Sequence, residues 1–407
     1  MTDPTSDFFL DSPAKLDDPF ADMAWFREHR PVYHHEPIDQ WFVFPYDEVR
    51  SLFADKRMSA NRMAGFVDAA PEPVRDELRG IVPYLEKWLL MRDGEDHSGL
   101  RTVLHRGFNA NAIKAMHEPI QQAADELLDA AIHDNRLDVA ADYAFLLGAY
   151  VLSDFMGVAP RDRHRVVQWS VDFVDFFNII PITEDSTHRM VRSATEMSAY
   201  THELLADRRG GGGDDFLGLM AAAAAEREIT DEEIVGNTLL LLIAGHVAVR
   251  NLIGNVIWLL LQHPSEAERF RADQPGLLHG LIEESLRYEP PITLIPRITT
   301  EEITVRGETI PSGAIVQLSI VAANRDPKPY PDPDHFDIAR NPRGVLSFGH
   351  GPHGCLGARL AREQAEIGLQ TLFRRVGTDF RLDQDAPLRW YRNAGNRGPE
   401  NLTILLD

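Results

Sequence analysis

Residues 348–357 read F-G-H-G-P-H-G-C-L-G, and this stretch decides the fold. Its Cys355 is the single cysteine of the chain and precedes a run with helical periodicity. Free N–H groups at a helix start favour a thiolate, and the glycines let the backbone turn tightly against a flat group. A lone cysteine is more often a small buried hydrophobe, whereas a thiolate in such a loop suits axial ligation of haem iron.

The ten residues closely resemble the haem-thiolate signature of the cytochrome P450 family, F-G-x-G-x-H-x-C-x-G, at every fixed position. The resemblance implies a mainly α fold with small β-sheets, in which one large domain (residues 1–407) surrounds a buried haem b. Cys355 is then the axial iron ligand, and Phe348 and Gly357 belong to the loop that binds the cofactor. We expect a β-rich lobe at about 1–95 and 291–325 and a helical haem lobe at about 96–290 and 326–380.

Four cationic residues resemble those that hold the haem propionates in the family: His97, Arg101, Arg297 and His353. The i,i+4 spacing of His97 and Arg101 places them on one face of a helix. The pair at 188 and 192 has the same spacing, but its surroundings favour a solvated helix face.

Glu284 and Arg287 match the family's E-x-x-R helix, because Y-E-P-P follows them as it does in the family. Residues 266–269 also fit the short pattern, so only the flanking residues decide between the two. Arg340 stands where the family places a second arginine. The resemblance implies that the three residues lock the scaffold behind the haem and play a structural role.

Residues 230–262 predict one helix of roughly 50 Å, which starts at Thr230 with Glu233 as its capping-box partner. The family carries A-G-x-(Asp/Glu)-Thr in this helix, on the face where oxygen binds. This chain has A-G-H-V-A instead, so Ala244 is kept while Val247 and Ala248 replace the acid and the threonine. Because neither replacement can donate or accept a hydrogen bond, the usual proton relay is missing.

Several explanations of this departure stay open. The substrate supplies a hydroxyl, an amine or an ordered water, so that protonation is substrate-assisted. The reaction is an oxidative C–C, C–N or C–O coupling or a desaturation, without oxygen insertion. Peroxide replaces dioxygen and reductant, or the change is neutral drift in a slow enzyme. The role of His246 is open, and we expect Arg250 to form an ion pair within the fold rather than to anchor a substrate carboxylate.

The resemblance also implies a substrate pocket with mostly apolar and aromatic walls. Such walls favour a sizeable organic substrate with few charges, and the aromatic run at 171–182 favours an aromatic one. Each residue taken alone is more typical of a protein core. The positions are Met63, Phe66, Trp88, Phe173, Phe176, Phe177, Ile180, Leu240, Ile243, Ile292, Leu294, Ile295, Ala394 and Asn396.

The composition argues against a protein that binds nucleic acids or membranes. The 407 residues include 41 Lys and Arg against 63 Asp and Glu, a net charge of −22, which argues against a nucleic-acid binder and against adhesion to anionic membranes. The apolar stretch 239–261 contains His246, Arg250 and two asparagines, so a buried core helix explains it better than a membrane span. The N-terminal residues lack the layout of a signal peptide, and we expect a cytoplasmic monomer.

No unit that binds flavin or nicotinamide is recognisable in the sequence. Electrons from NAD(P)H must then arrive through separate proteins, by resemblance a ferredoxin and its reductase. We expect a basic landing face on the cysteine side of the protein, formed by Arg101, His105, Arg106, Arg359 and Arg362.

The expected function is oxidation of a small, aromatic natural product in secondary-metabolite biosynthesis, with hydroxylation ranked first and coupling or desaturation next. A peroxygenase and a haem protein that binds a ligand without turnover are the remaining alternatives.

Overall fold

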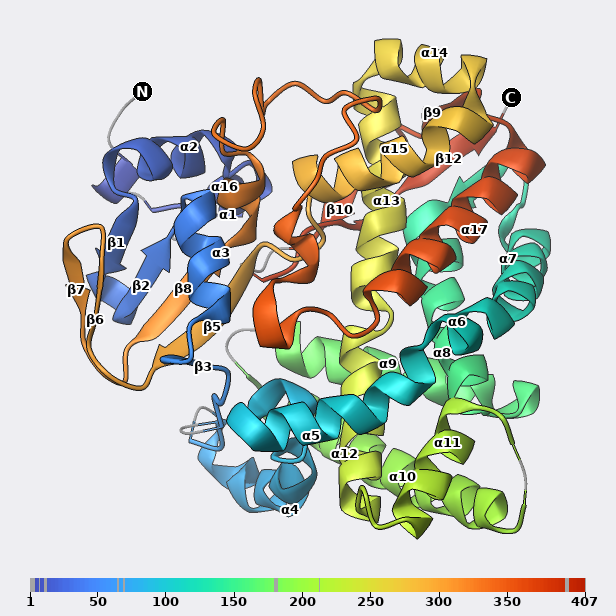
Figure 1. Ribbon diagram of the computed structural model, residues 1–407. Coiled ribbons are helices and arrows are strands. Elements are labelled where there is room, and N and C mark those ends of the chain that lie inside the picture. The colour runs from blue at the N-terminus through green and yellow to red at the C-terminus, as the bar shows by residue number, and fades with distance from the viewer. Residues whose placement is uncertain are drawn as a thin grey trace.

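The structure is a computed structural model, and it describes residues 4–6, 8–10, 13–63, 66–68, 70–178, 182–211, 213–391 and 395–406. A β-rich part lies beside a larger helical part (Figure 1). The mainly helical architecture with small sheets confirms the predicted fold class. The sequence boundaries expected for the two lobes stay a prediction.

Seventeen α-helices are present in the described residues. They are α1 (Pro13–Asp17), α2 (Phe20–His29), α3 (Tyr46–Ala54), α4 (Arg75–Leu85), α5 (Gly94–Leu104), α6 (Ala110–Ala115), α7 (His117–Ala131), α8 (Phe145–Met156), α9 (Arg163–Asn178), α10 (Glu184–Arg209), α11 (Phe216–Ala225), α12 (Asp231–Ala244), α13 (Val247–Gln262), α14 (Pro264–Ala272), α15 (Gln274–Tyr288), α16 (Ile320–Asn324) and α17 (Ala358–Val376). Helical periodicity in the sequence predicts helices over 119–133, 162–177, 188–208, 276–288 and 356–375, and these ranges agree with α7, α9, α10, α15 and α17 within a few residues.

The strands are short. They are β1 (Val32–His35), β2 (Gln40–Val43), β3 (Met58–Ser59), β4 (Arg136–Asp138), β5 (Leu294–Thr299), β6 (Ile303–Val305), β7 (Glu308–Ile310), β8 (Ile315–Ser319), β9 (Phe380–Leu382), β10 (Arg389–Trp390), β11 (Pro399–Asn401) and β12 (Thr403–Leu406). The largest sheet has the order β1-β2-β8-β5-β3, with β2 and β8 parallel and its other pairs antiparallel.

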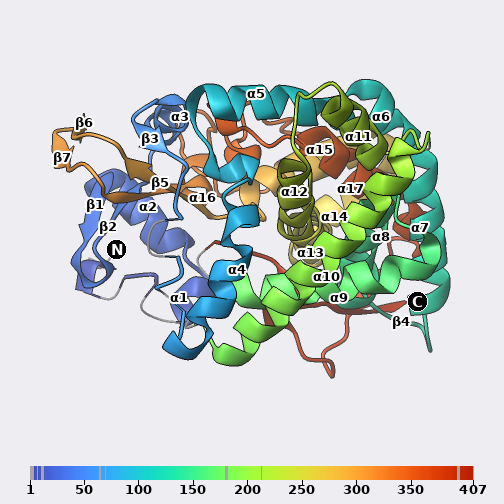
Figure 2. The ribbon, with the colours of Figure 1, turned by 90° about the horizontal axis from the view of Figure 1, so that it is seen from below.

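The prediction of one uninterrupted helix over 230–262 is wrong. Its predicted start is correct, since Thr230 Oγ1 accepts the Glu233 N–H at 3.2 Å and Glu233 Oε2 accepts the Thr230 N–H at 2.9 Å. However, α12 ends at Ala244, and His246 has φ −129° and ψ −36°, outside the helical region. Glycine weakens a helix interior, so Gly245 lets the chain leave the helix, and α13 then resumes close to the same line (Figures 1 and 2).

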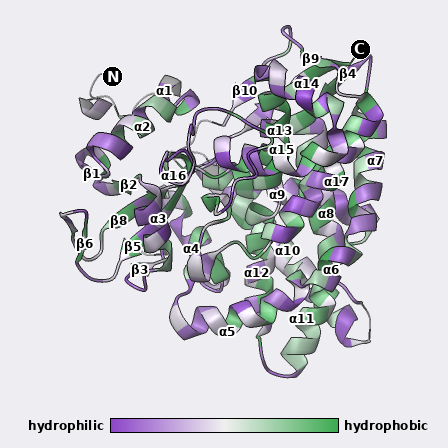
Figure 3. Cartoon of the chain, turned by 45° about the horizontal axis from the view of Figure 1, so that its top comes forward, coloured by the Kyte–Doolittle hydropathy of each residue, from purple (hydrophilic) through white to green (hydrophobic). Residues whose placement is uncertain are grey.

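The helix pair α12–α13 forms the centre of the helical part. It contacts α4, α8, α9, α10, α15 and α17, and Figure 2, seen from below, looks nearly along it. Hydrophobic residues dominate these interior helices, whereas the outer turns are mostly hydrophilic (Figure 3). A helix buried on most sides needs apolar residues all round, which is why this stretch lacks an amphipathic pattern.

Two stretches, Val139–Met156 and Asp231–Gln262, are long and apolar enough to cross a membrane by length and composition alone. In both stretches 67% of the most apolar window is buried inside the protein, as in the core helices of a soluble domain. They are therefore only a weak indication of membrane spans, and burial explains their composition.

Candidate functional site

The cysteine loop folds back on itself before α17. Cys355 donates its N–H to the Phe348 carbonyl at 2.8 Å, and Gly354 donates to Gly351 at 3.0 Å. Gly349 and Gly351 have φ of 68° and 71°, the left-handed region where a side chain would be strained. The side chain of Cys355 remains accessible at the open side of the loop.

The groups around Cys355 shift the pKa of its thiol in opposite directions. The protein packed around the loop raises the pKa of the thiol, whereas the Gly357 N–H and the charges of Arg101 and Arg362 lower it. Burial has the larger effect on this pKa, and the Gly357 N–H at the start of α17 acts in the direction that the sequence suggested. A coordinated metal ion stabilises a thiolate much more strongly, and an accessible thiol among cations suits such a ligand.

A cluster of cationic side chains brings together residues from distant segments. The rings of His97 and His353 lie 4.1 Å apart between centroids, and His353 Nε2 lies 3.2 Å from Asp93 Oδ1. Arg297 and Arg62 both donate to the Pro296 carbonyl, at 3.0 and 2.9 Å. We call His97, Arg101, Arg297, His353 and Arg62 the cation cluster.

The electrostatics of this cluster favour an anionic ligand. Burial first, and like charges second, lower the pKa of His353 to about 4 and of Arg297 to about 10. The pKa of Arg62 is lowered to about 10 by burial. Asp93 is the carboxylate that acts on both arginines, and in the described part of the chain His97 Nε2 is buried without a hydrogen-bond partner. An orphaned donor amid excess positive charge fits the two carboxylates of a haem.

Arg62 is a site residue that sequence reasoning missed. It follows β3, whose antiparallel partner β5 carries Arg297 one residue from the paired Ile298. Only this strand pairing, which has no local sequence signal, brings Arg62 to the cluster.

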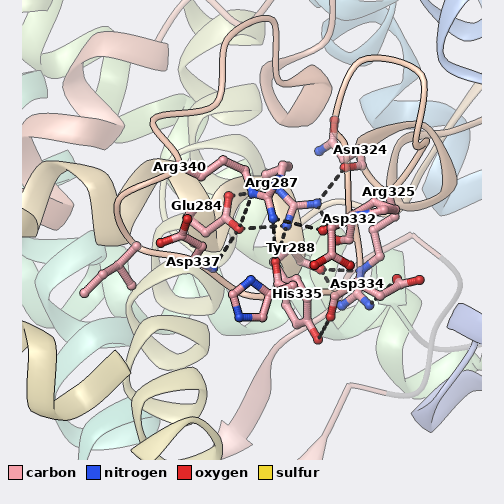
Figure 4. A network of polar contacts seen from close by, with 12 residues as sticks. Glu284, Arg287, Tyr288, Asn324, Arg325, Asp332, Asp334, His335, Asp337 and Arg340 are labelled. Atoms are coloured by element: carbon pink, nitrogen blue, oxygen red, sulfur yellow. Dashed lines mark hydrogen bonds and ion pairs between the residues drawn. The ribbon is translucent and has the colours of Figure 1, made fainter. Parts of the chain in front are cut away.

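A network of polar contacts surrounds the buried E-x-x-R pair, Glu284 and Arg287 (Figure 4). Arg287 Nη2 donates to Glu284 Oε1 at 2.7 Å and Nε to Oε2 at 2.8 Å, and both side chains are 0% exposed. Arg340 Nε donates to the same Glu284 Oε1 at 3.0 Å. Arg287 also donates to the carbonyls of Asn324 and Pro333, so the pair ties α15 to the irregular chain around 324–340.

Residues 266–269, which also fit the E-x-x-R pattern, contact the same irregular segment of the chain. Glu266 Oε2 accepts the Ile338 N–H at 3.1 Å, and Arg269 donates to both Glu266 and Asp337. Both glutamates therefore hold the same short segment, since Glu284 accepts the Asp337 N–H at 3.1 Å.

The predicted distal positions lie on either side of the α12–α13 break. Ala244 is exposed and Ala248 is partly exposed, whereas Val247 is buried. The break therefore presents two alanines, and no hydroxyl or carboxyl, to its accessible side.

An aromatic group lies between the segment after β3, the end of α4 and α9. The ring centroids of Phe66 and Phe177 are 6.1 Å apart, and those of Trp88 and Phe177 5.8 Å. Phe176 lies 6.0 Å from Phe66, and Phe173 6.4 Å from Phe177. We call these five residues the aromatic group.

Asn237 of α12 positions Trp88, which sequence reasoning did not foresee. Its Oδ1 accepts the Leu89 N–H at 2.8 Å and its Nδ2 donates to the Lys87 carbonyl at 2.9 Å, so it holds the backbone on both sides of Trp88. Within the described residues the buried Trp88 Nε1 has no hydrogen-bond partner.

The other predicted pocket positions are spread over several regions. Leu240, Ile243 and Met63 are partly buried against the helical core, and Ile292 bridges Asn396. Ile292 and Ile295 pack against the core of the β-rich part. Leu294 belongs to the core formed with α2, away from the aromatic group, because alternate residues of β5 face opposite sides of the sheet. Ile180 and Ala394 lie outside the described residues.

The predicted landing face is less basic than the sequence suggests. Arg106 pairs with Glu228, Arg362 with Glu283 at 2.5 Å, and Arg359 with Glu363 at 3.7 Å. Glu363 lies one turn further along α17, whereas Glu228 and Glu283 come from distant segments, so the arginines near the cysteine overstate the local positive charge.

Comparisons with known proteins agree with this geometry. The family model described as Cytochrome P450 matches residues 161–389. "Cyclomarin C epoxidase CymV" of Salinispora arenicola (strain CNS-205) is 32% identical over 380 residues, which cover 93% of each chain. "Biotin biosynthesis cytochrome P450" of Bacillus subtilis (strain 168) is 30% identical over 364 residues, 89% of this chain and 90% of that protein.

Solved structures are similar over nearly the whole chain. The crystal structure of CalO2 has a TM-score of 0.88 at 28% identity and covers 100% of this chain and 98% of that one. The enzyme CxnD, described as acting in C–S bond formation in chuangxinmycin biosynthesis, has a TM-score of 0.81 at 32% identity, with 95% and 94% covered.

Proposed function

Since the chain belongs to the cytochrome P450 family, we propose that it hydroxylates a small, aromatic natural product with protonation assisted by the substrate. As a member of that family it is a monooxygenase-type oxidoreductase that uses haem b and electrons from NAD(P)H delivered by redox partners. Relatives named for an epoxidase and for polyketide biosynthesis support a role in bacterial secondary-metabolite biosynthesis.

The observation that carries this proposal is the cation cluster beside the accessible Cys355. The cluster supplies charge and an orphaned donor for the propionates, and the loop presents the thiol as the one sulfur ligand. A haem held by Cys355 would supply the activation of dioxygen. The network around Glu284 and Arg287 extends toward the loop through Asn324, whose carbonyl accepts from Arg287 and whose Oδ1 accepts the Leu346 N–H at 2.9 Å.

The aromatic group supports the choice of substrate. Phe66 and Phe177 are partly exposed, and such rings favour contact with another aromatic surface, whereas Trp88, Phe173 and Phe176 are at most 2% exposed. Apolar walls also keep bulk water from the reacting atoms. Because Val247 and Ala248 cannot pass a proton, a hydroxyl or an amine on the substrate is suited to that role.

A second candidate function is oxidative coupling or desaturation. The missing acid and threonine favour it, because such a product gains no oxygen atom, and the similar CxnD is described as forming a C–S bond. The product distinguishes the candidates, since hydroxylation adds one oxygen atom whereas coupling or desaturation removes two hydrogen atoms.

Reconstitution tests the proposal. Purified protein is mixed with ferredoxin, ferredoxin reductase and NAD(P)H, the partners we propose for a cytoplasmic monomer, and offered a panel of aromatic natural products. A substrate-dependent hydroxylated product is expected. Turnover with peroxide alone would indicate a peroxygenase, and a spectral shift on ligand binding without any product would indicate a non-turnover binder. The carbon-monoxide spectrum of the reduced protein, compared with that of Cys355→Ser, checks thiolate ligation separately.

A further inference from the structure

The break between α12 and α13 separates an accessible side of the helix pair from a closed side. Ala244 before the break is exposed and Ala248 after it is partly exposed. His246, which caps α13, is 0% exposed, and Arg250 one turn later is 6% exposed. The chain thus passes from the open face to the closed face within the break itself.

The polar groups on the closed side lack partners. Among the described residues, neither ring nitrogen of His246 has a hydrogen-bond partner, and the same holds for Nε and Nη2 of Arg250. The helical backbone pattern is interrupted here, since the Gly245 N–H donates to the Leu241 carbonyl and the pattern resumes with the Arg250 N–H, which donates to the His246 carbonyl. Each buried polar group left unpaired costs about 1–3 kcal/mol, so four in one place require another partner.

The side chains that pack against His246 and Arg250 are mainly aromatic. The His246 ring packs edge-on against Phe145 at 5.0 Å, and a Cβ on Gly148 would come within 2.6 Å of His246 Cβ. Arg250 lies over the rings of Tyr391 and Phe145, at 4.2 and 5.5 Å from the centroids. Aromatic faces attract a cation but accept no in-plane N–H bond, and buried polar groups in such a site are satisfied by ordered water.

The ion pair expected for Arg250 is not present within the described part of the chain. Glu400 and Asp138 act on Arg250 only through their charges, and burial still lowers its pKa to about 10, so it stays protonated. Burial and the neighbouring Arg250 lower the pKa of His246 to about 3. The Leu242 carbonyl acts in the opposite direction and raises the pKa of His246.

A neutral imidazole has one donor and one acceptor nitrogen, so His246 can accept a proton from one water while it donates to another. We propose that His246 and Arg250 hold ordered water in the α12–α13 break, and that this water carries protons from the closed side to the open side at Ala244 and Ala248. One proton enters and one leaves in each transfer, and nothing along the path is oxidised or reduced. The proposal rests on the proposed function, because it provides a source of protons where Val247 and Ala248 provide none.

A crystal structure of the haem-loaded protein at high resolution gives the first test. Ordered water within hydrogen-bond distance of the His246 ring and of Arg250 is expected. A dry apolar contact around both side chains would overturn the proposal whatever the enzyme does.

Matched variants give the second test. His246→Phe removes both ring nitrogens, and His188→Phe is its control, since His188 also has an arginine four residues later but lies on an exposed helix face bonded to Glu77. We expect His246→Phe to lower product formed per NAD(P)H consumed by about tenfold, the effect of one lost hydrogen bond, and to raise peroxide release and the solvent isotope effect. Substrate binding by difference spectrum should be unchanged, and His188→Phe should match the unsubstituted protein.

The outcomes separate this inference from the proposed function. If the unsubstituted protein makes no oxygenated product, the proposed function fails, and the crystallographic water still tests the inference. If product forms and both phenylalanine variants couple equally well, the inference fails alone. His246→Gln keeps a donor and an acceptor and should retain most of the coupling. Should His246→Phe not fold, Arg250→Met keeps the packed stem and removes the second water-binding group, with the same loss expected.

Discussion

At the scale of single residues, this site depends on buried charges whose partners come from other segments. Glu284 and Arg287 are fully buried and satisfied, whereas the cation cluster has more positive charge than Asp93 can balance. Buried charges are stable only when paired, so the first arrangement is complete in the protein alone and the second requires a ligand.

Glu284→Gln tests the buried pair of Glu284 and Arg287, in which each charge has its partner within the protein. The substitution leaves Arg287 buried without its anion, and we expect a loss of about 3–5 kcal/mol in the free energy of unfolding. Denaturant unfolding measures it, with the exposed Glu203→Gln of α10 as a control that should change little. An equally small effect at both positions would contradict a structural role for the pair.

Arg62→Met tests the cation cluster, whose positive charge requires an anionic ligand. The loss of one charge-assisted hydrogen bond to a propionate, about 1.5–3 kcal/mol, predicts that haem leaves roughly ten times faster or more. Haem transfer to an excess of a scavenging apoprotein measures the rate. Arg57→Met, at an exposed arginine bonded to Asp55, should keep the original rate.

At the scale of elements, the main difference from the sequence-based prediction is the break between α12 and α13, where one uninterrupted helix was expected. Its backbone conformation depends on the neighbouring α8, because His246 occupies the space that Gly148 leaves free. The polar side chains of Arg250, Asn251 and Asn255 in α13 are buried rather than exposed to solvent.

The pH dependence of stability reports on His246. Its pKa is about 3 in the native protein and about 6.5 when unfolded, so between these values the unfolded state binds one more proton. Stability therefore falls as the pH falls below about 6.5, by about 1.4 kcal/mol per pH unit from this residue. His246→Phe should remove that slope, as measured by denaturant unfolding from neutral to mildly acidic pH. His97, His263 and His353 also have lowered pKa values and remain in both proteins, so the difference isolates His246.

Gly148→Ala tests the packing of α8 on the break. The new Cβ would meet His246 Cβ at 2.6 Å, and overpacking of this kind costs about 1–3 kcal/mol. Gly99→Ala in α5, where nothing lies within 4 Å of the added Cβ, should instead be neutral or stabilising. Thermal unfolding of the two variants compares them, and equal melting temperatures would contradict the close contact.

At the scale of the whole molecule, the cation cluster joins the two parts of the fold. Arg62 and Arg297 come from β3–β5 of the β-rich part, whereas His97 and Arg101 come from α5 and His353 from the cysteine loop. A ligand that neutralises the cluster therefore connects segments that otherwise repel one another.

Haem removal should loosen these segments together. Binding to the native state alone stabilises it by mass action, and repulsion within the cluster is restored when the carboxylates leave. We expect faster hydrogen exchange in β5 and α5 of the haem-free protein and little change in α10, which lies away from the cluster. Uniform exchange rates with and without haem would contradict this.

The sequence by itself determined the cysteine loop, the start of α12 and the enzyme class, because these depend on short patterns of turns, caps and helical periodicity. Tertiary structure decided the break at Gly245–His246, the recruitment of Arg62 and Asn237, the place of Leu294, and the acids that neutralise the landing face. These features arise from contacts between segments far apart in the chain, such as β3 with β5 and α8 with α13. A local pattern specifies which conformation a segment prefers, whereas packing and buried charge determine which neighbour it meets.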